Sequence, residues 1–142
     1  MTTRGRKRIM IVEDEEKIAT VLASQLALAG YDVHTETHGS VALRYAAEHQ
    51  PDLVILDVKL PDVSGYVVCK ELRTLYHAWV VPVLMITAMD QPIDQLRGFA
   101  HGADAYLTKP FNLTEVAETV ALLLEDRIGD RIGDGSYFRS GN

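Results

Sequence analysis

Five side chains suited to phosphoryl or metal chemistry follow four short, mostly apolar runs of this chain. They are Glu13 and Asp14 after residues 9–12, Asp57 after 53–56, Thr87 after 83–86, and Lys109 after 105–108. Carboxylates, a hydroxyl and an ammonium in one place suit a divalent cation and a phosphoryl group. The chemistry therefore depends on whether the fold brings these segments together.

The four runs are predicted to be strands of one parallel sheet. Their apolar residues do not alternate strictly with polar ones, which is typical of strands buried on both faces. In such a sheet the ligand site lies at the carboxyl ends of the strands. Parallel stacking of the runs therefore predicts that all five side chains line one pocket.

Segments with helical periodicity separate the runs. An apolar stripe over residues 18–26 predicts a helix that ends at Gly30, and a stripe over 41–47 predicts a helix that Ser40 caps. Three further helices are predicted: 68–75 after Gly65, 93–100 closing at Gly102, and 112–126 capped by Asn112. The strand over 33–37 is the most polar one, which places it at an edge of the sheet.

Strands that alternate with helices five times predict an α/β fold, a doubly wound five-stranded parallel sheet with right-handed crossovers. We assign this domain to residues 8–127. Residues 1–7 are expected to form a flexible basic leader and residues 128–142 a flexible tail or linker. Two tandem tetrapeptides at 126–133 are compatible with a linker towards an output domain and equally with a frayed terminus.

The composition is that of a soluble globular chain. Its 142 residues are 47% hydrophobic and 24% charged, and no apolar run approaches the roughly 18 residues of a membrane span. Cys69 is the single cysteine, which excludes a disulfide framework, and the N-terminus has no hydrophobic signal core. We therefore expect a cytoplasmic protein that makes no membrane contact.

The charge distribution argues against nucleic-acid binding. The net charge is −6, and because the first eight residues carry four basic and no acidic side chains, the rest of the chain carries −10. Binding of DNA or RNA requires neutralisation of phosphates, for which an acidic body is poorly suited. We expect no direct nucleic-acid binding by this domain.

The residue types after the first strand favour a metal over a bare phosphate. A dinucleotide or free phosphate needs a glycine-rich turn there, whereas this chain has Glu13, Asp14 and Glu15. Oxygen ligands from Asp14 and Asp57 suit Mg²⁺, or Mn²⁺ in its place. The sequence therefore predicts that an anion approaches through a divalent cation.

Asp57 is the predicted nucleophile of the pocket. A carboxylate beside a bound cation can attack phosphorus and form an aspartyl phosphate. The cation would then neutralise one phosphoryl oxygen, the Lys109 ammonium a second, and the Thr87 hydroxyl with the Ala88 N–H would bond the third.

In four motifs the sequence resembles the receiver domains of bacterial two-component response regulators. The matching motifs are IVEDE at 11–15, LDVKLPDVSG at 56–65, ITA at 86–88 and GADAYLTKPF at 102–111. The resemblance covers roughly residues 8–127. It implies the flavodoxin-like strand order 2-1-3-4-5, as in a chemotaxis receiver.

The resemblance also implies a role for each site residue. Asp57 would accept a phosphoryl group, Asp14 would bind the metal directly, Glu13 would help through water, Lys59 would contribute its backbone carbonyl, and Thr87 and Tyr106 would form a switch pair. In that pair the hydroxyl moves to the phosphoryl group and the aromatic ring turns inward. The bond before Pro110 would be a cis peptide.

A receiver is a phosphorylation-activated switch, so the resemblance implies a signalling protein that is not a turnover enzyme. The phosphodonor would be a sensor histidine kinase, a phosphotransfer protein or a small phosphodonor. Phosphorylation would change the face formed by the fourth helix, the fifth strand and the fifth helix. That face would control a partner, an output domain or a homodimer.

Two departures and two alternatives accompany the resemblance. Glu13 stands where aspartate is commoner, and the helix over 112–126 lacks the arginine-rich face of receivers in the winged-helix transcription factor class. A haloacid-dehalogenase-like phosphatase needs a second aspartate two residues after the nucleophile, where this chain has Lys59. A pseudo-receiver that only binds proteins usually lacks a residue of the pocket, whereas here all five are present.

Overall fold

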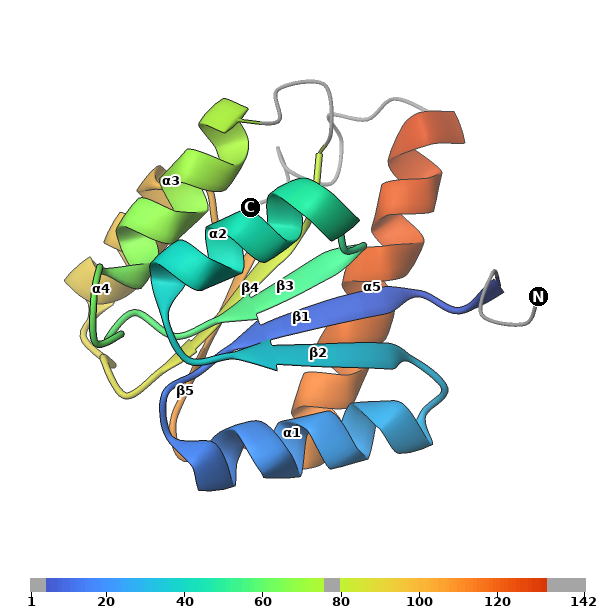
Figure 1. Cartoon of the computed structure of the whole chain (residues 1–142), viewed down its shortest axis with the longest axis horizontal. Helices are drawn as coiled ribbons and strands as arrows, with labels where there is room; N and C mark the ends of the chain where they lie inside the picture. The colour runs from blue at the N-terminus through green and yellow to red at the C-terminus, as the bar shows by residue number, and fades with distance from the viewer. Residues whose placement is uncertain (1–4, 76–79, 133–142) are drawn as a thin grey trace.

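A five-stranded parallel sheet in the order β2-β1-β3-β4-β5 forms the centre of the structure, a computed structural model that describes residues 5–75 and 80–132 (Figure 1). The strands are β1 Arg8–Val12, β2 Asp32–Glu36, β3 Leu53–Leu56, β4 Val83–Thr87 and β5 Ala105–Thr108. The helices are α1 Glu16–Leu28, α2 Gly39–His49, α3 Gly65–Leu75, α4 Pro92–Ala100 and α5 Leu113–Ile132. The predicted fold class and strand order are confirmed.

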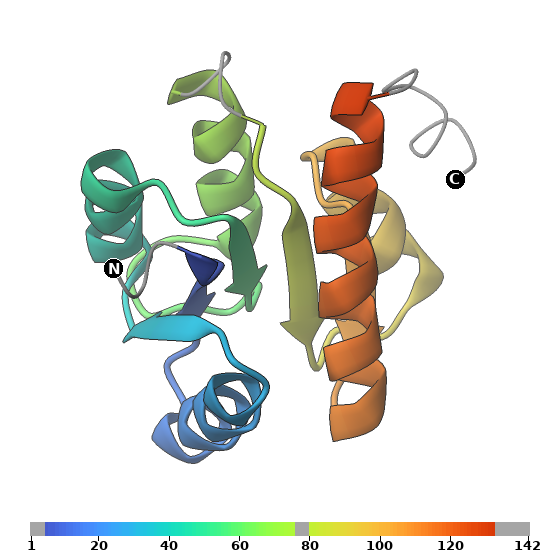
Figure 2. The same ribbon diagram turned by 90° about the vertical axis from the view of Figure 1, so that its right-hand side faces the viewer.

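Helices cover both faces of the sheet (Figure 1, Figure 2). Successive side chains of a strand point to opposite faces. Ile9 and Ile11 of β1 therefore pack in one hydrophobic core with side chains of α1 and α5. Met10 and Val12 pack in a second core with side chains of α2 and α3. These two cores fix the sheet between its helical layers.

The strands differ in burial according to their position in the sheet. The central strands β3 and β4 are buried at every residue, and β1 is buried at every residue except Arg8. The edge strands β2 and β5 are mostly half-buried. The polar strand was predicted to lie at an edge, and β2 confirms this.

The register of the sheet aligns the carboxyl ends of its strands. Val12 is the register partner of Leu56, and Thr87 is the partner of Thr108. Hydrogen bonds continue the ladder one residue further, because the Asp57 N–H donates to the Val12 carbonyl at 3.0 Å and the Lys109 N–H donates to the Thr87 carbonyl at 2.9 Å. Residues that follow the strands therefore start from fixed positions.

Two of the predicted helix ends are confirmed. Gly30 follows α1 with a φ of 102°, a left-handed conformation that favours glycine. The Asn112 side-chain oxygen accepts the Glu115 N–H at 3.1 Å and so caps α5. The Lys109–Pro110 peptide is cis, as the resemblance implied.

The predicted cap of α2 is wrong. Ser40 lies inside the helix, which begins at Gly39, and His38 at the cap position makes no side-chain cap bond. The Asp62 carboxylate, from the loop after β3, instead accepts the Gly39 N–H at 2.8 Å and the Ser40 N–H at 2.9 Å. A residue 22 positions away thus performs the capping that a local serine was expected to supply.

The end predicted for the last helix is also wrong. We expected it to end near Asp126, whereas α5 continues to Ile132, through most of the two tandem tetrapeptides. Residues 1–4 of the expected leader and 133–142 of the expected tail lie outside the described residues. The division of the chain at residues 7 and 127 stays a prediction.

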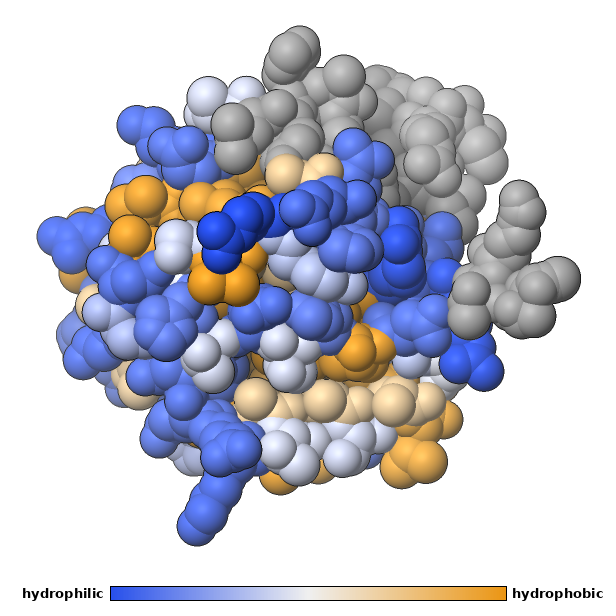
Figure 3. All heavy atoms as spheres, in the orientation of Figure 1, coloured by the Kyte–Doolittle hydropathy of each residue, from blue (hydrophilic) through white to orange (hydrophobic). Residues whose placement is uncertain are grey.

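No helix in the described ranges is long and apolar enough to cross a membrane. Figure 3 shows a largely hydrophilic surface in the view of Figure 1, with hydrophobic atoms in small separate patches.

The long-range cap of α2 predicts a pH-dependent loss of stability. Hydrogen bonds from Ser40 and Gly39 hold the pKa of the Asp62 carboxyl well below its usual range. A carboxyl with a lowered pKa stabilises the fold above its unfolded pKa, and this stabilisation is lost as the pH falls through the folded value. We therefore expect Asp62→Ala to lower the urea midpoint at pH 7 and the difference to shrink below about pH 4.

Urea titrations of the two proteins at pH 7 and at acidic pH measure this effect. Asp90→Ala is the matched control, because Asp90 is exposed and, among the residues that the structure describes, its side chain bonds only the side chain of its neighbour Gln91. Equal midpoints for Asp62→Ala and the parent protein at pH 7 would show that the cap adds nothing to stability.

Candidate functional site

The Lys109 ammonium lies among three carboxylates at the carboxyl edge of the sheet. Its Nζ is 2.8 Å from Asp57 Oδ2, 2.9 Å from Glu13 Oε1 and 3.5 Å from Glu15 Oε1. Glu13 and Asp57 are almost fully buried, whereas Glu15 is exposed. Segments that follow β1, β3 and β5 therefore meet at one ammonium group.

The start of α3 packs directly against the backbone of Asp57. The Gly65 N–H donates to the Val58 carbonyl at 2.7 Å. A Cβ at position 65 would lie 2.1 Å from the Asp57 carbonyl oxygen, so the close approach requires glycine. The Lys59 N–H also donates to Asp57 Oδ1 at 3.3 Å. The loop after β3 thus holds the Asp57 side chain in a fixed orientation.

The charges of Glu13 and Lys109 are coupled through their hydrogen bond. Burial raises the pKa of the Glu13 carboxyl, and bonds from Lys109 and the Glu15 N–H offset this in part. Burial by itself lowers the pKa of the Lys109 ammonium, but the bonds to Asp57 and Glu13 outweigh it and hold that pKa above its usual range. Lys109 is therefore positively charged at neutral pH.

Glu13, Asp14 and Asp57 form an acidic cluster that fits a divalent cation. Each offers a carboxylate oxygen, and these oxygens lie within 4.8 Å of one another. Asp14 is exposed and, within the part of the chain that the structure describes, makes no hydrogen bond or ion pair. Hard oxygen donors with room for water are the ligands that Mg²⁺ prefers. The residues that would hold the ion are thus Asp14 and Asp57, with Glu13 behind them.

Thr87 and Tyr106 converge on one residue of the loop between β4 and α4. The buried Thr87 hydroxyl oxygen accepts the Met89 N–H at 3.4 Å, and the Tyr106 hydroxyl donates to the Met89 carbonyl at 2.8 Å. Thr87 and Asp57, both within the described residues, form no hydrogen bond with each other, and Ala88, next to Thr87 in the chain, is exposed. The predicted site residues are therefore brought to one edge, with Thr87 and Tyr106 joined to each other through Met89.

An ion pair that sequence reasoning missed holds β5 beside β4. Arg73 of α3 donates to Asp104 Oδ2 at 2.9 Å, to the Gly102 carbonyl at 2.6 Å and to the Val81 carbonyl. The same Asp104 oxygen accepts the Val83 N–H at 2.8 Å. Asp104 belongs to the motif that resembles receivers, whereas no local pattern marks Arg73. The pair fixes the start of the strand that ends at Lys109.

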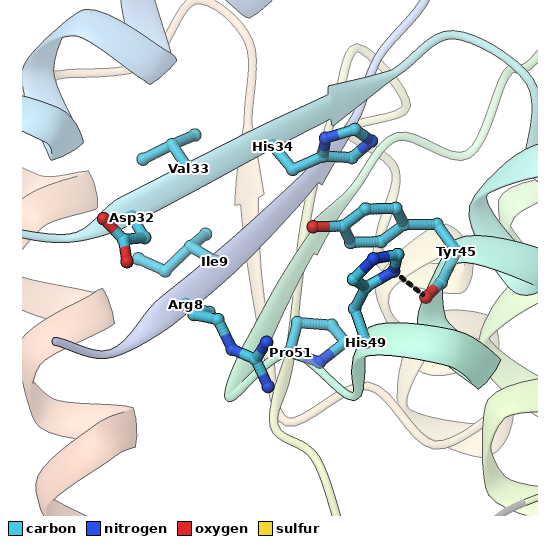
Figure 4. A pocket seen from close by; sticks show the side chains of 8 residues that line it. All are labelled: Arg8, Ile9, Asp32, Val33, His34, Tyr45, His49 and Pro51. Atoms are coloured by element: carbon cyan, nitrogen blue, oxygen red, sulfur yellow. Dashed lines mark hydrogen bonds between the residues drawn. The ribbon is translucent and has the colours of Figure 1, made fainter. Parts of the chain in front are cut away.

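A small cavity of about 130 Å³ lies at the opposite edge, where β1 and β2 begin (Figure 4). The Tyr45 ring lies between two histidine rings, with centroids 3.7 Å from His34 and 4.1 Å from His49. Because the histidines stack on opposite faces of Tyr45, they cannot bind one metal ion together. This stack is separate from the acidic cluster.

The strand order, the aligned carboxyl ends and the acidic cluster beside a lysine together define the receiver class of α/β folds. Solved structures share this architecture. The chemotaxis protein CheY4 of Vibrio cholerae matches with a TM-score of 0.79 and 30% identity over 84% of this chain and 99% of that one. The beryllofluoride-activated receiver domain of Klebsiella pneumoniae RstA matches with a TM-score of 0.77 and 30% identity over 83% and 98%.

This chain belongs to the response regulator receiver domain family, whose model matches residues 9–121. It is 45% identical over 118 residues to the alkaline phosphatase synthesis transcriptional regulatory protein PhoP of Bacillus subtilis, covering 83% of this chain and 48% of PhoP. It is 43% identical over 125 residues to the DNA-binding dual master transcriptional regulator RpaA of Synechocystis, covering 88% and 51%. The chain spans about half the length of these relatives.

Removal of the Lys109 ammonium should lower the stability of the fold by an amount that depends on pH. Lys109→Met leaves the buried Glu13 and Asp57 carboxylates without their counter-charge, so we expect the free energy of unfolding to fall by roughly 1.5–3 kcal/mol at pH 7. Without Lys109 the folded pKa of Glu13 rises further above its unfolded value. A raised carboxyl pKa costs stability at high pH and none below the unfolded value. The deficit should therefore shrink as the pH falls towards about 4.

Urea unfolding at several pH values measures the deficit. Lys70→Met, which removes an exposed lysine of α3, is the control and should leave stability nearly unchanged. A Lys109→Met deficit that stays constant from pH 7 to pH 4 would contradict the electrostatic explanation.

Proposed function

We propose that the chain is a phosphorylation-activated signalling switch in which Asp57 accepts the phosphoryl group. The observation that carries this proposal is the Lys109 Nζ at 2.8 Å from Asp57 Oδ2, beside carboxylates within 4.8 Å of one another. Asp57 thus lies beside a fixed cation and beside two carboxylates that could hold a second one. Both charges are placed to neutralise an incoming phosphoryl group.

Phosphoryl transfer requires little of the protein beyond positioning and charge. A carboxylate oxygen of Asp57 forms the new P–O bond as the P–N bond of a donor phosphohistidine breaks, and the electron pair leaves with the donor imidazole. Bound Mg²⁺ or Mn²⁺ supplies charge neutralisation for the transferred group. Lys109 neutralises another oxygen, and the Thr87 hydroxyl with the Ala88 N–H bonds the third.

The residue two positions after Asp57 supports a switch over a turnover enzyme. Lys59, two residues after Asp57, is exposed and offers no carboxylate for general acid–base catalysis. We therefore propose self-phosphorylation and autodephosphorylation only. A sensor histidine kinase, a phosphotransfer protein or a small phosphodonor would supply the phosphoryl group. The expected location is the cytoplasm.

The output surface is the switch face, which we define as α4, β5 and α5. An aspartyl phosphate adds about 1.5 to 2 negative charges and would draw the Thr87 hydroxyl towards it. Since Thr87 and Tyr106 both bond Met89, this movement would reach the loop before α4. The switch face exposes a set of large apolar side chains: Ile93, Leu96, Phe99 and Leu122. Phe99 also lies beside the Tyr106 ring, with centroids 6.4 Å apart.

An exposed apolar surface of this kind suits a protein partner, an output domain or a second copy of the chain. Because the whole-length relatives are transcriptional regulators by name, control of transcription is one output that we propose for a protein containing this domain. Residues 128–142 would then serve as the linker.

Substitution of the acceptor provides the central test. We expect Asp57→Asn to abolish labelling by acetyl phosphate with Mg²⁺, because the carboxylate placed for in-line attack is gone. Phos-tag electrophoresis measures the product, which should be acid-labile in the parent protein. Asp90→Asn, at an exposed aspartate after β4, is the control and should label normally. Undiminished labelling of Asp57→Asn would move the acceptor to another residue, and an unlabelled parent protein would favour a pseudo-receiver.

The metal site should distinguish Asp14 from Glu13. We expect Asp14→Asn to weaken Mg²⁺ binding by about tenfold or more, because it removes a direct ligand. Glu13→Gln should weaken binding less, because Glu13 already bonds Lys109 and the Glu15 N–H. Amide shifts of residues near the cluster, followed by NMR during Mg²⁺ titration, give the affinities. Glu16→Gln is the control, and equal affinity of Asp14→Asn and the parent protein would refute the assignment.

A further inference from the structure

α4 buries little of its surface against the rest of the domain. Of its nine residues, all within the described chain, Asp94 and Gly98 alone are buried. Ile93, Leu96 and Phe99 on the same helix are 52%, 63% and 43% exposed. Burial of apolar surface therefore contributes little to fixing this helix. Its position depends on a few specific contacts.

Tyr66, the second residue of α3, contacts both ends of α4. Its hydroxyl donates to the Asp94 carbonyl, in the first turn of α4, at 3.1 Å. Its ring stacks on that of His101, the residue that caps the other end, with centroids 5.1 Å apart and an interplanar angle of 22°. One side chain from a neighbouring helix thus contacts the first turn of α4 and the residue that follows its last turn.

The hydrogen bond from Tyr66 reaches Asp94 in the capped first turn of α4. Asp94 Oδ2 accepts the Gln91 N–H at 3.0 Å, and the Gln91 side chain in turn accepts the Asp94 N–H. These bonds form the capping box that begins α4. Because Asp94 is bonded to Gln91 in this way, a hydrogen bond to Asp94 positions the whole first turn of α4.

Tyr106 contacts α4 and the loop before it from β5. Its hydroxyl bonds the Met89 carbonyl just before α4, and a Cβ at Gly98 would lie 2.9 Å from its ring. Burial raises the pKa of the Tyr106 phenol above its usual range, and the adjacent Tyr66 phenol raises it further. The two tyrosines are therefore neighbours that hold one helix from two elements.

We propose that Tyr66 is a second positioning residue of the switch, which holds α4 in the arrangement seen here and sets how readily the switch face responds to phosphorylation. This inference rests on the proposed function, because it requires that a group on Asp57 displaces α4. Tyr66 touches neither Asp57 nor the acidic cluster in the hydrogen bonds and ring contacts of the described residues. It acts through α4.

The expected effect of removing Tyr66 follows from the equilibrium between two positions of α4, the one seen here and a displaced one. Contacts made in one arrangement oppose a shift to the other by their full free energy. The Tyr66 hydroxyl bond and ring stack belong to the present arrangement, so their removal should favour the displaced one. A ligand that requires displacement of α4 then binds more tightly.

Beryllofluoride, which stands in for the phosphoryl group on Asp57, is the probe for this effect. NMR titration of the full chain with beryllofluoride and Mg²⁺ gives an apparent Kd for the parent protein and for Tyr66→Phe. We expect the variant to bind about 2- to 10-fold more tightly, the range that loss of one hydrogen bond supports. His101→Ala, which removes the stacking partner from outside α3, should shift the Kd in the same direction.

Tyr45→Phe is the matched control, because it removes a tyrosine hydroxyl on α2 that makes no contact with α4; its Kd should not change. Thermal unfolding of each variant separates stability from switching. An unchanged or weaker Kd for Tyr66→Phe, with or without a lower Tm, would overturn the inference and leave Tyr66 a structural residue. A parent protein that shows no beryllofluoride shifts would instead reject the proposed function, and the inference with it.

Discussion

The ion pairs of the Lys109 ammonium with two buried carboxylates are the interaction on which the rest of the site depends. Two buried carboxylates, Glu13 and Asp57, approach the same Nζ at 2.9 and 2.8 Å. Without that positive charge the burial of both acids would cost several kcal/mol through desolvation and mutual repulsion. The cation therefore permits the acidic cluster to exist in a folded chain. Asp14, the third acid of the cluster, is exposed and has no hydrogen bond or ion pair within the described part of the chain.

The sheet fixes the geometry of this interaction, because Glu13, Asp57 and Lys109 each follow directly after a strand of the sheet. Asp57 and Lys109 have backbone N–H groups bonded to the neighbouring strands, so their side chains start from positions that the ladder fixes. The Arg73–Asp104 pair fixes the entrance of β5 in the same way. A rigid carboxyl edge is what phosphoryl transfer needs, because its catalysis is mostly positioning and charge.

The side of the domain occupied by α4 is held less rigidly than the carboxyl edge of the sheet. α4 buries little and is held by polar and aromatic contacts from Tyr66 and Tyr106. Such contacts are individually worth about 1 kcal/mol, so they can be exchanged without unfolding the sheet. Under the proposed function, a rigid edge at Asp57 and one loosely held helix would convert a local charge into a change of surface.

The sequence by itself determined the sheet, its edge strand and the residues that meet at the carboxyl ends of the strands. Apolar runs of four or five residues mark buried strands irrespective of context, and the residues that end them meet because parallel strands share a carboxyl edge. The tertiary structure alone decided which residues contact each other across the chain. Asp62, and not Ser40, caps α2, Arg73 pairs with Asp104, and Tyr66 bonds Asp94 of α4. Each of these contacts joins residues at least 22 positions apart in the chain. Local periodicity carries no information about such pairs, because the geometry that joins them exists only after the helices have packed on the sheet.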